Sequence, residues 1–256
     1  FIDSDWDVKQ LLKTMVMSYT YQQDSRASKE LLERDPENRL LARGPSYRLP
    51  AEMIRDNALV ASGLLATEVG GESVRPYQPE GLWIEKSNFS AKLLRYQESE
   101  GKNLHRRSLY TFIKRTSPHP AMTAFDAPTR DFCTVKREKT NTPLQALVLM
   151  NDPQFVEAAR AMAQKVQQVA AGNLQAQLSY AWKASVVRTP TEIEVGFLVE
   201  FFQRQLSDFQ DSPANARELL AIGEHPQDPA LDPAYTAALT MVNSTILNHD
   251  EAYMKR

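Results

Sequence analysis

Four charged residues around the start of a predicted helix have the types and spacing of a ligand-binding or acid–base site. Glu52, Arg55 and Asp56 stand at positions i, i+3 and i+4, so an α-helix places them on one face. Arg48 precedes this helix closely enough to reach the same face. Two carboxylates beside arginines can bind an acidic or polyhydroxylated ligand and exchange protons with it. The simpler interpretation is an ion-pair lattice that ties the helix to a neighbour.

A second set of candidates lies in the run HRRSLYTFIKR, residues 105–115. Arginines interleaved with aromatic rings can stack on sugars or bases, which makes Arg106, Arg107 and Tyr110 candidate binding residues. If the run is extended, Arg107 faces one side and Arg106 with Tyr110 faces the other. The alternative, which we favour, is a buried segment whose cations pair with acidic helices.

The densest group of polar residues without helical periodicity lies in the stretch FDAPTRDFCTVKREKTNTPLQ, residues 125–145. This stretch ends at the start of a predicted helix, whose first-turn amides and dipole favour a negative group. Such a loop can bind an anion or a carbohydrate, or it can simply hold a helix array together. The main functional hypothesis from the sequence rests here, on Asp126, Arg130, Arg137, Thr140 and Asn141.

Common catalytic and cofactor motifs are missing from the sequence. The single cysteine, Cys133, allows no disulfide within the chain, no CxxC pair and no CxxCH haem attachment motif. Four scattered histidines lack the spacing of zinc ligands, so we expect no metal and no cofactor in this segment. The signatures GxSxG, SxxK, GxGxxG and the P-loop are absent as well. We expect Cys133 to be a small buried residue rather than a nucleophile.

Charge and hydropathy exclude two classes of partner. A net charge of −2 over 256 residues argues against a general nucleic-acid binder, because such binders neutralise many phosphates. No run of about 18 apolar residues occurs, so we expect no membrane span in this segment. The opening FIDSDWDVKQ resembles the interior of a larger protein, and an export signal can therefore lie upstream of it.

Hydrophobic periodicity predicts that helices position most of these candidates. Apolar residues at 8, 11, 12, 15, 16 and 19 predict a first helix, and residues 50–65 predict a second that ends at the glycines 70–71. Residues 66–141 read as an irregular basic and polar region, with a short strand or helix at SLYTFIK and an extended loop over 116–132. We assign the methionines, including those at 15, 17, 53 and 162, to the core.

From Thr142 onward, a capping residue followed by proline marks successive helix starts. The pairs stand at 142–143, 152–153, 189–190, 212–213 and 232–233, and proline suits the first helical position. Thr142 with Gln145, and Thr189 with Glu192, also complete capping boxes. The run QALVLM then forms a short buried helix between the first two starts.

Together these patterns predict a mainly α protein. We expect one domain over residues 1–256, built from N-terminal helices (1–65), a large irregular central region (66–141) with room for one or two short strands, and a multi-helical array (142–256).

Several long motifs of this chain resemble one family. They are WDVKQLLKTMVMSYTYQQDS, DPENRLLARGPSYRLPAEMIRDNALVASGLL, SVRPYQPEGLW, the stretch from RRSLYTFIKR to AARAMA, and the terminal LNHDE. The chain is similar along these motifs to planctomycete-specific domain one, a domain of unknown function. No catalytic residue is established for that family, so the resemblance transfers none.

The resemblance implies a setting for the protein. Family members look exported, which implies a periplasmic or cell-surface location in planctomycetes and related bacteria rich in polysaccharide-degrading systems. The domain forms the C-terminal part of larger proteins that often carry a c-type cytochrome domain upstream. The implied partners are therefore those upstream domains, with any c-type haem located there, and a glycan.

We therefore expect a non-catalytic binding or assembly module of an exported, cytochrome-linked protein with a relation to glycans. The alternative is an enzyme that acts on polysaccharide-derived substrates, with acid–base roles for Asp126, Glu52 or Asp56, and with Arg107 or Arg130 orienting the substrate. An enzyme of this kind should show two carboxyl groups across an open pocket, roughly 5–10 Å apart for glycoside hydrolysis. A module should show the same residues closed into ion pairs.

Overall fold

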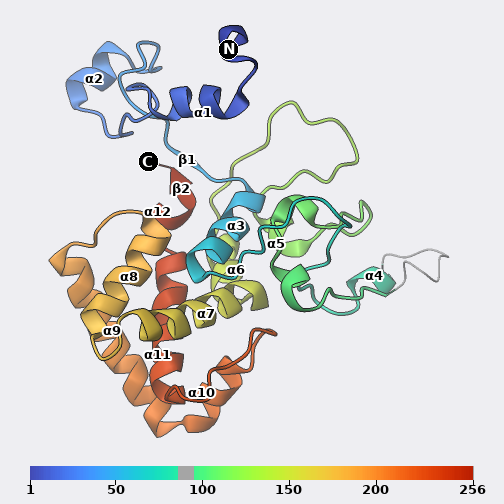
Figure 1. Cartoon of the computed structure of the whole chain (residues 1–256), viewed down its shortest axis with the longest axis vertical. Coiled ribbons are helices and arrows are strands. Elements are labelled where there is room, and N and C mark those ends of the chain that lie inside the picture. Colours follow the sequence, from blue (N-terminus) through green and yellow to red (C-terminus); the bar gives the residue numbers. More distant parts are fainter. Residues whose placement is uncertain (86–94, 256) are drawn as a thin grey trace. The chain divides into compact units, whose positions relative to one another are not determined.

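A computed structural model describes residues 1–85 and 95–255 and shows a mainly helical protein with one small sheet, as predicted (Figure 1). The chain divides into two compact units. The first comprises residues 1–48 with 254–256, and the second comprises residues 49–253.

The first unit contains a 3-10 turn, two short helices and the two-stranded sheet. These elements are η1 (Ile2–Ser4), α1 (Val8–Val16), α2 (Lys29–Arg34), β1 (Tyr47–Arg48) and β2 (Met254–Lys255). β1 pairs with β2 in antiparallel register, with Tyr47 opposite Lys255. The apolar stripe that predicts α1 is exposed along its length, at Val8, Leu11, Leu12, Met15 and Val16. The periodicity therefore predicted a helix correctly but did not predict a buried face.

The second unit is the helical array with its irregular central region. Its helices are α3 (Ala51–Ser62), α4 (Leu82–Glu85), α5 (Pro120–Ala124), α6 (Pro143–Asn151), α7 (Pro153–Val169), α8 (Leu174–Val186), α9 (Glu192–Asp211), α10 (Pro213–Leu220), α11 (Pro233–Leu247) and α12 (Asp250–Tyr253), with 3-10 turns η3 (Gly101–His105) and η4 (Ser108–Tyr110). The core forms where α7 packs against α3 and α11, and α11 against α9. Fully buried alanines of α7 and α11, such as Ala158, Ala159 and Ala238, allow close helix packing there.

Capping residues set most of the helix starts. Proline stands at the first position of α6, α7, α10 and α11, as predicted, and Thr142 with Gln145 forms the expected capping box. The start of α9 was wrong by two residues, because its cap is Thr191 and its capping box is Thr191 with Glu194.

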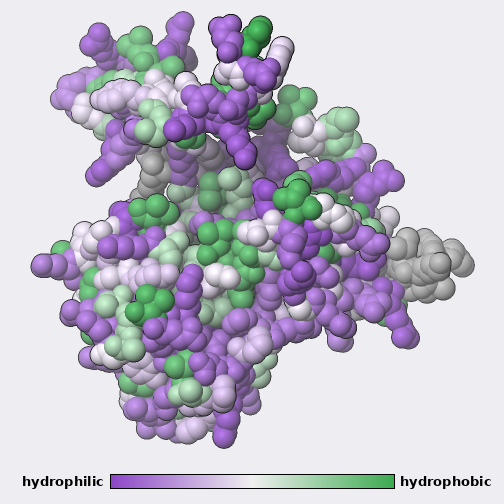
Figure 2. All heavy atoms as spheres, in the orientation of Figure 1, coloured by the Kyte–Doolittle hydropathy of each residue, from purple (hydrophilic) through white to green (hydrophobic). Residues whose placement is uncertain are grey.

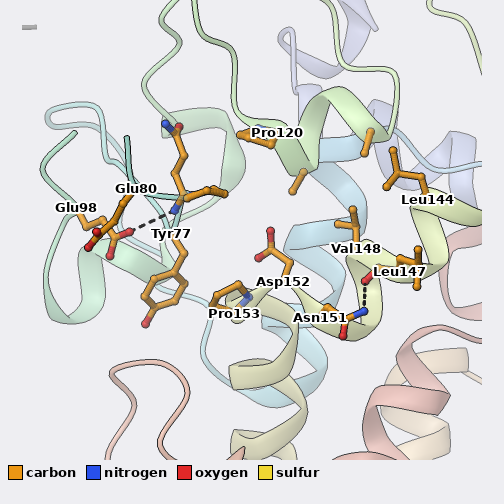
Figure 3. A pocket seen from close by; sticks show the side chains of 14 residues that line it. Tyr77, Glu80, Glu98, Pro120, Leu144, Leu147, Val148, Asn151, Asp152 and Pro153 are labelled. Atoms are coloured by element: carbon orange, nitrogen blue, oxygen red, sulfur yellow. Dashed lines mark hydrogen bonds between the residues drawn. The ribbon is translucent and has the colours of Figure 1, made fainter. Parts of the chain in front are cut away.

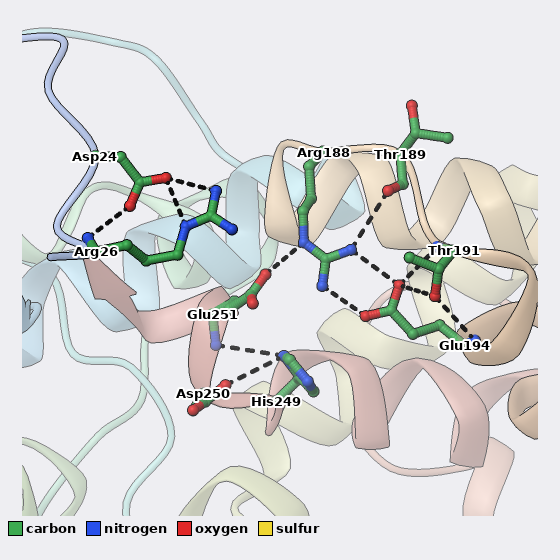
Figure 4. A network of polar contacts seen from close by, with 9 residues as sticks. All are labelled: Asp24, Arg26, Arg188, Thr189, Thr191, Glu194, His249, Asp250 and Glu251. Atoms are coloured by element: carbon green, nitrogen blue, oxygen red, sulfur yellow. Dashed lines mark hydrogen bonds and ion pairs between the residues drawn. The ribbon is translucent and has the colours of Figure 1, made fainter. Parts of the chain in front are cut away.

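An ion-pair network supports the capping box at the start of α9. Arg188 donates hydrogen bonds to both carboxylate oxygens of Glu194, at 2.9 and 2.6 Å, and to Glu251 at 2.6 Å (Figure 4). The hydrogen bond from Arg188 lowers the pKa of Glu194 to about 2. Glu194 thus remains an anion, held where it also accepts the backbone N–H of Thr191 at 2.7 Å.

Four further sequence predictions need correction. Helix α3 ends at Ser62, because Gly63 adopts the left-handed conformation (φ 85°) and caps it, and not at 70–71. The predicted loop over 116–132 contains α5. Met162 is buried, but Met15, Met17 and Met53 are exposed. The helix over QALVLM forms as α6 but is buried on one side only: Gln145 and Leu149 are buried, whereas Leu147 and Met150 are 56% and 44% exposed. The part of the irregular-region prediction that covers 86–94 lies outside the described residues.

Candidate functional site

Arg55 is the most enclosed of the predicted site residues and is 3% exposed. Its Nη1 donates to the carbonyl oxygen of Arg106 at 2.8 Å and to Oγ of Ser108 at 3.2 Å. Its Nε donates to Oε1 of Gln154 at 2.6 Å, and its Nη2 to the carbonyl oxygen of Leu104. Burial lowers the pKa of Arg55 to about 10, which leaves it a cation. Arg55 therefore binds the irregular region to α3 and α7, and its donors face protein groups.

The remaining residues of the first predicted set do not form one site, because they have different partners. Glu52 accepts a bidentate pair from Arg137, at 2.7 and 3.1 Å. Burial raises the pKa of Glu52, but the hydrogen bond from Arg137, a backbone hydrogen bond and the charges of Arg137 and Arg130 together outweigh it, so the net direction is downward. Asp56 accepts the backbone N–H of Ser108 at 2.7 Å. Arg48 belongs to β1 in the first compact unit.

In the second predicted set, Arg106 and Tyr110 bind each other and the backbone of residues 70–72. The segment is not extended throughout, because Ser108–Tyr110 form a 3-10 turn, but Arg106 and Arg107 do lie on different sides: Arg106 is buried and Arg107 is exposed. The Arg106 guanidinium lies over the ring of Tyr110, 3.8 Å from its centroid, and donates to the carbonyl oxygen of Glu72 at 2.9 Å. The Tyr110 hydroxyl accepts the N–H of Gly70 at 2.8 Å. Arg106 and Tyr110 thus stack on each other within the chain.

The third predicted set closes the base of its own loop. Asp126, at φ 60°, accepts the N–H of Thr140 at 2.7 Å and its hydroxyl at 2.9 Å. Arg130 and Asn141 are exposed. Cys133 is exposed as well, so the prediction of a buried cysteine was wrong; it lies in a polar loop with no hydrophobic partner element.

An open pocket lies in the second unit, between residues 77–80, the start of α5 and helix α6 (Figure 3). We call it the α6 pocket; its volume is about 670 Å³. Its apolar walls come from three segments and include Pro79, Pro120, Ala121, Leu144, Leu147 and Val148. Its polar side chains include Tyr77, Glu80, Glu98 and Asp152. Pockets of this size and composition are typical of small-molecule sites.

Asp152 connects the helix array to the α6 pocket. Its carboxylate caps α7 by accepting the N–H of Gln154 at 3.1 Å, as the DP pair predicts. In Figure 3 the same carboxyl group points toward the space between Tyr77, Pro120 and Val148. Burial raises the pKa of Asp152 to about 6, with hydrogen bonds from Gln154 and the charge of Arg55 opposing the rise. The sequence predicted that Asp152 caps a helix. Its position in the pocket wall is seen only in the folded structure.

The raised pKa makes a testable pH dependence. A group whose folded pKa exceeds its unfolded value of 3.8 stabilises the fold at low pH and loses that contribution as pH rises through about 6. Relative to Asp152→Asn, whose amide also caps helices well, the wild-type free energy of unfolding should fall by about 2 kcal/mol between pH 4.5 and 7.5. Urea denaturation at several pH values measures this difference. A difference that stays constant with pH would contradict the shifted pKa.

A second group of polar residues, which the sequence did not indicate, is buried around Glu157. Glu157 is 1% exposed and lies 2.8 Å from Nε2 of His105. Its Oε1 accepts the Tyr77 hydroxyl at 3.1 Å and the N–H of His225 at 2.6 Å, and Arg160 lies 4.0 Å away. Although burial raises the pKa of Glu157, the hydrogen bond from His105 contributes to a net lowering. Glu157 therefore holds segments around His105, Tyr77 and His225 together through hydrogen bonds.

Figure 2 shows hydrophilic side chains over much of the viewed face, with hydrophobic residues in separate patches. Scattered exposed apolar residues are normal, so a concave wall is the more informative feature. Among residues 1–85 and 95–255, no cluster of three or more His, Cys, Asp or Glu is arranged to hold a metal ion. No described helix has the length and hydropathy of a membrane span.

Comparison with known proteins identifies the family. No curated protein and no solved structure matches the chain. The family model PSD1, described as protein of unknown function (DUF1553), matches residues 1–202. This match confirms the resemblance seen in the sequence motifs, and it includes α3, α6, the start of α7 and every residue that lines the α6 pocket. The chain therefore belongs to the PSD1 family of proteins of unknown function (DUF1553).

Proposed function

We propose that this chain is a non-catalytic binding module and that the α6 pocket is its binding site. One observation carries the proposal: most of the predicted polar candidates are paired with groups of the chain itself, whereas the α6 pocket is open and mainly apolar. A helix that exposes Leu144 and Leu147 at a concave wall gains free energy when a ligand covers them.

The wider setting is part of the same proposal. We propose an exported, extracytoplasmic protein linked to a c-type cytochrome domain and related to glycans, and this setting rests on the resemblance to planctomycete-type proteins alone. Binding at the α6 pocket and assembly with upstream domains are compatible, because a pocket with apolar walls can take a small ligand while other surfaces contact protein partners.

A second candidate function, an enzyme, is supported by Asp152. A carboxyl group with a pKa of about 6 inside a pocket has the value expected of a general acid or base near neutral pH. Glu52, Asp56 and Asp126 suit this role less well, since none of them lines the α6 pocket. A turnover assay that loses activity in Asp152→Asn while ligand binding persists would favour the enzyme.

The binding role can be tested with a simple apolar probe. We expect 1-hexanol to shift the methyl NMR signals of Leu144 and Val148, which line the pocket. Leu147→Ser removes apolar contact area and should weaken this binding about fivefold, from about 1 kcal/mol of lost burial.

Leu109→Ser is the matched control, because Leu109 is also exposed (71%) but does not line the pocket. Both variants should keep the wild-type melting temperature, since exposed substitutions change stability little. Absence of any Leu144 or Val148 shift at saturating hexanol, or equal weakening by both variants, would contradict the proposed site.

A further inference from the structure

The charged side chains of the α6 pocket all have the same sign. Glu80, Glu98 and Asp152 line it, and no Lys, Arg or His stands among its described lining residues. Glu98 accepts the N–H of Gln78 at 3.2 Å, which fixes one carboxylate at the wall (Figure 3). Carboxyl groups in apolar walls favour a cation as their partner in the pocket and disfavour an anion.

The nearest buried cation cannot serve as that partner. Arg55 lies behind Asp152 and its charge lowers the pKa of that carboxyl, but its hydrogen bonds go to Gln154, Ser108 and backbone carbonyl groups. Asp152 itself is bonded by Gln154. A carboxylate has about four lone-pair sites, so Asp152 retains capacity to accept a hydrogen bond from a ligand.

We propose that the α6 pocket binds an organic ammonium ion, in which a positively charged amine sits on an aliphatic or aromatic stem. The ammonium group pairs with Asp152 and is attracted by Glu80 and Glu98, and the stem packs against Leu144, Leu147 and Pro120. This inference rests on the proposed function, because it specifies the ligand class of the same pocket. A carboxylate ligand is disfavoured by the same three charges.

The ammonium should bind in a pH-dependent way. Asp152 is an anion at pH 7.5 and mostly neutral at pH 5, given its pKa of about 6. Arg55 from α3 and Gln154 on its own helix act on Asp152, and Tyr77, Glu80 and Glu98 line the same pocket. His119, at the start of α5, stays neutral in this range because burial lowers its pKa to about 4.

The experiment compares two probes of equal length on the full 256-residue chain. Titrations with n-hexylamine and 1-hexanol, followed by the methyl signals of Leu144 and Val148, give both affinities in the same pocket. At pH 7.5 we expect hexylamine to bind about tenfold more tightly, the range of one charge-assisted hydrogen bond. At pH 5 the preference should fall to about twofold.

Two variants separate the charge from the capping role. Asp152→Asn keeps an N-cap side chain and removes the anion, so the amine preference at pH 7.5 should disappear while hexanol still binds. Asp232→Asn is the matched control: Asp232 caps α11 before a proline in the same way but does not line the pocket. It should leave the tenfold preference unchanged.

The outcomes distinguish the ammonium ligand class from the proposal that the α6 pocket is a binding site. Equal affinity for hexylamine and hexanol would overturn the ammonium class and leave the binding site standing, and an amine preference that survives in Asp152→Asn would overturn the role of Asp152. No signal change with either probe would overturn both. Nα-acetyl-lysine methylamide supplies the same ammonium on a peptide: binding by it supports a lysine side chain as the source, and binding by hexylamine alone supports a free amine.

Discussion

Glu157→Ala should lower the free energy of unfolding by about 3–5 kcal/mol, the cost typical of removing one partner from a buried charge pair. Glu157 is 1% exposed, as is Arg160 beside it. Without the carboxylate, the Tyr77 hydroxyl and the N–H of His225 lose their acceptor, and Arg160 keeps a buried charge with less compensation. Urea denaturation followed by circular dichroism measures the change.

Two companion variants keep this prediction testable if the alanine variant does not fold. Glu157→Gln retains the shape and one acceptor, so it should lose about half as much. Gly223→Ala should also be strongly destabilising, because an added Cβ would lie 2.6 Å from the Glu157 carboxyl group and Gly223 has φ 84°. Glu200→Ala, at an exposed site, should change stability by less than about 0.5 kcal/mol.

The same cluster predicts the direction of acid sensitivity. The pKa of Glu157 in the folded protein lies below its ordinary value of 4.5, so its contribution is present above that pH and is lost as pH falls through the lower value. The stability gap between wild type and Glu157→Gln should therefore shrink on acidification. A gap that widens at low pH, or a Glu157→Ala variant within 1 kcal/mol of wild type, would contradict the buried-anion account.

Arg55→Lys is expected to be almost as damaging, at about 2–4 kcal/mol, although it preserves the charge. Arg55 donates along a planar fork to the carbonyl oxygens of Leu104 and Arg106 and to Gln154. A lysine ammonium group cannot donate to all of these acceptors at once, so some buried acceptors stay unpaired. Hydrogen exchange should show faster opening around residues 104–108, alongside a lower urea midpoint.

The control for Arg55→Lys is the same arginine-to-lysine substitution at an exposed position. Arg204 pairs with Glu200 one turn earlier on α9, and both side chains are about two-thirds exposed, at 67% and 68%. Arg204→Lys should cost less than about 0.5 kcal/mol. If the two variants show equal stability, the interpretation of Arg55 as a buried connector fails.

The helices were predictable where local chemistry sets their limits. Pro143, Pro153, Pro213 and Pro233 each begin a helix, since a proline at the first position sacrifices no hydrogen bond. Gly63 was missed as the end of α3 because the sequence offers two more prominent glycines further on. The α9 start was misplaced because two threonines offer a capping box, and the one at Thr191 forms with Glu194, which Arg188 holds; Arg188 in turn pairs with Glu251, 63 residues away.

The α6 pocket could not be read from the sequence, because its walls come from segments far apart in the chain. Tyr77, Pro120 and Leu147 have no shared motif or spacing. Asp152 looked like a helix cap, and it is one. Its place in the pocket wall and its raised pKa come from burial by distant segments, which leaves no local pattern in the sequence.

The sequence by itself determined the mainly α fold, the family and most helix starts, since periodicity, caps and motifs act over a few residues. Only the tertiary structure decided which polar residues are free. It paired Glu52 with Arg137 and Asp126 with Thr140, partners 85 and 14 residues apart, and it left α6 with two exposed leucines. Burial and pairing are properties of the packed array, and a chain pattern specifies residue types without specifying which neighbours they meet.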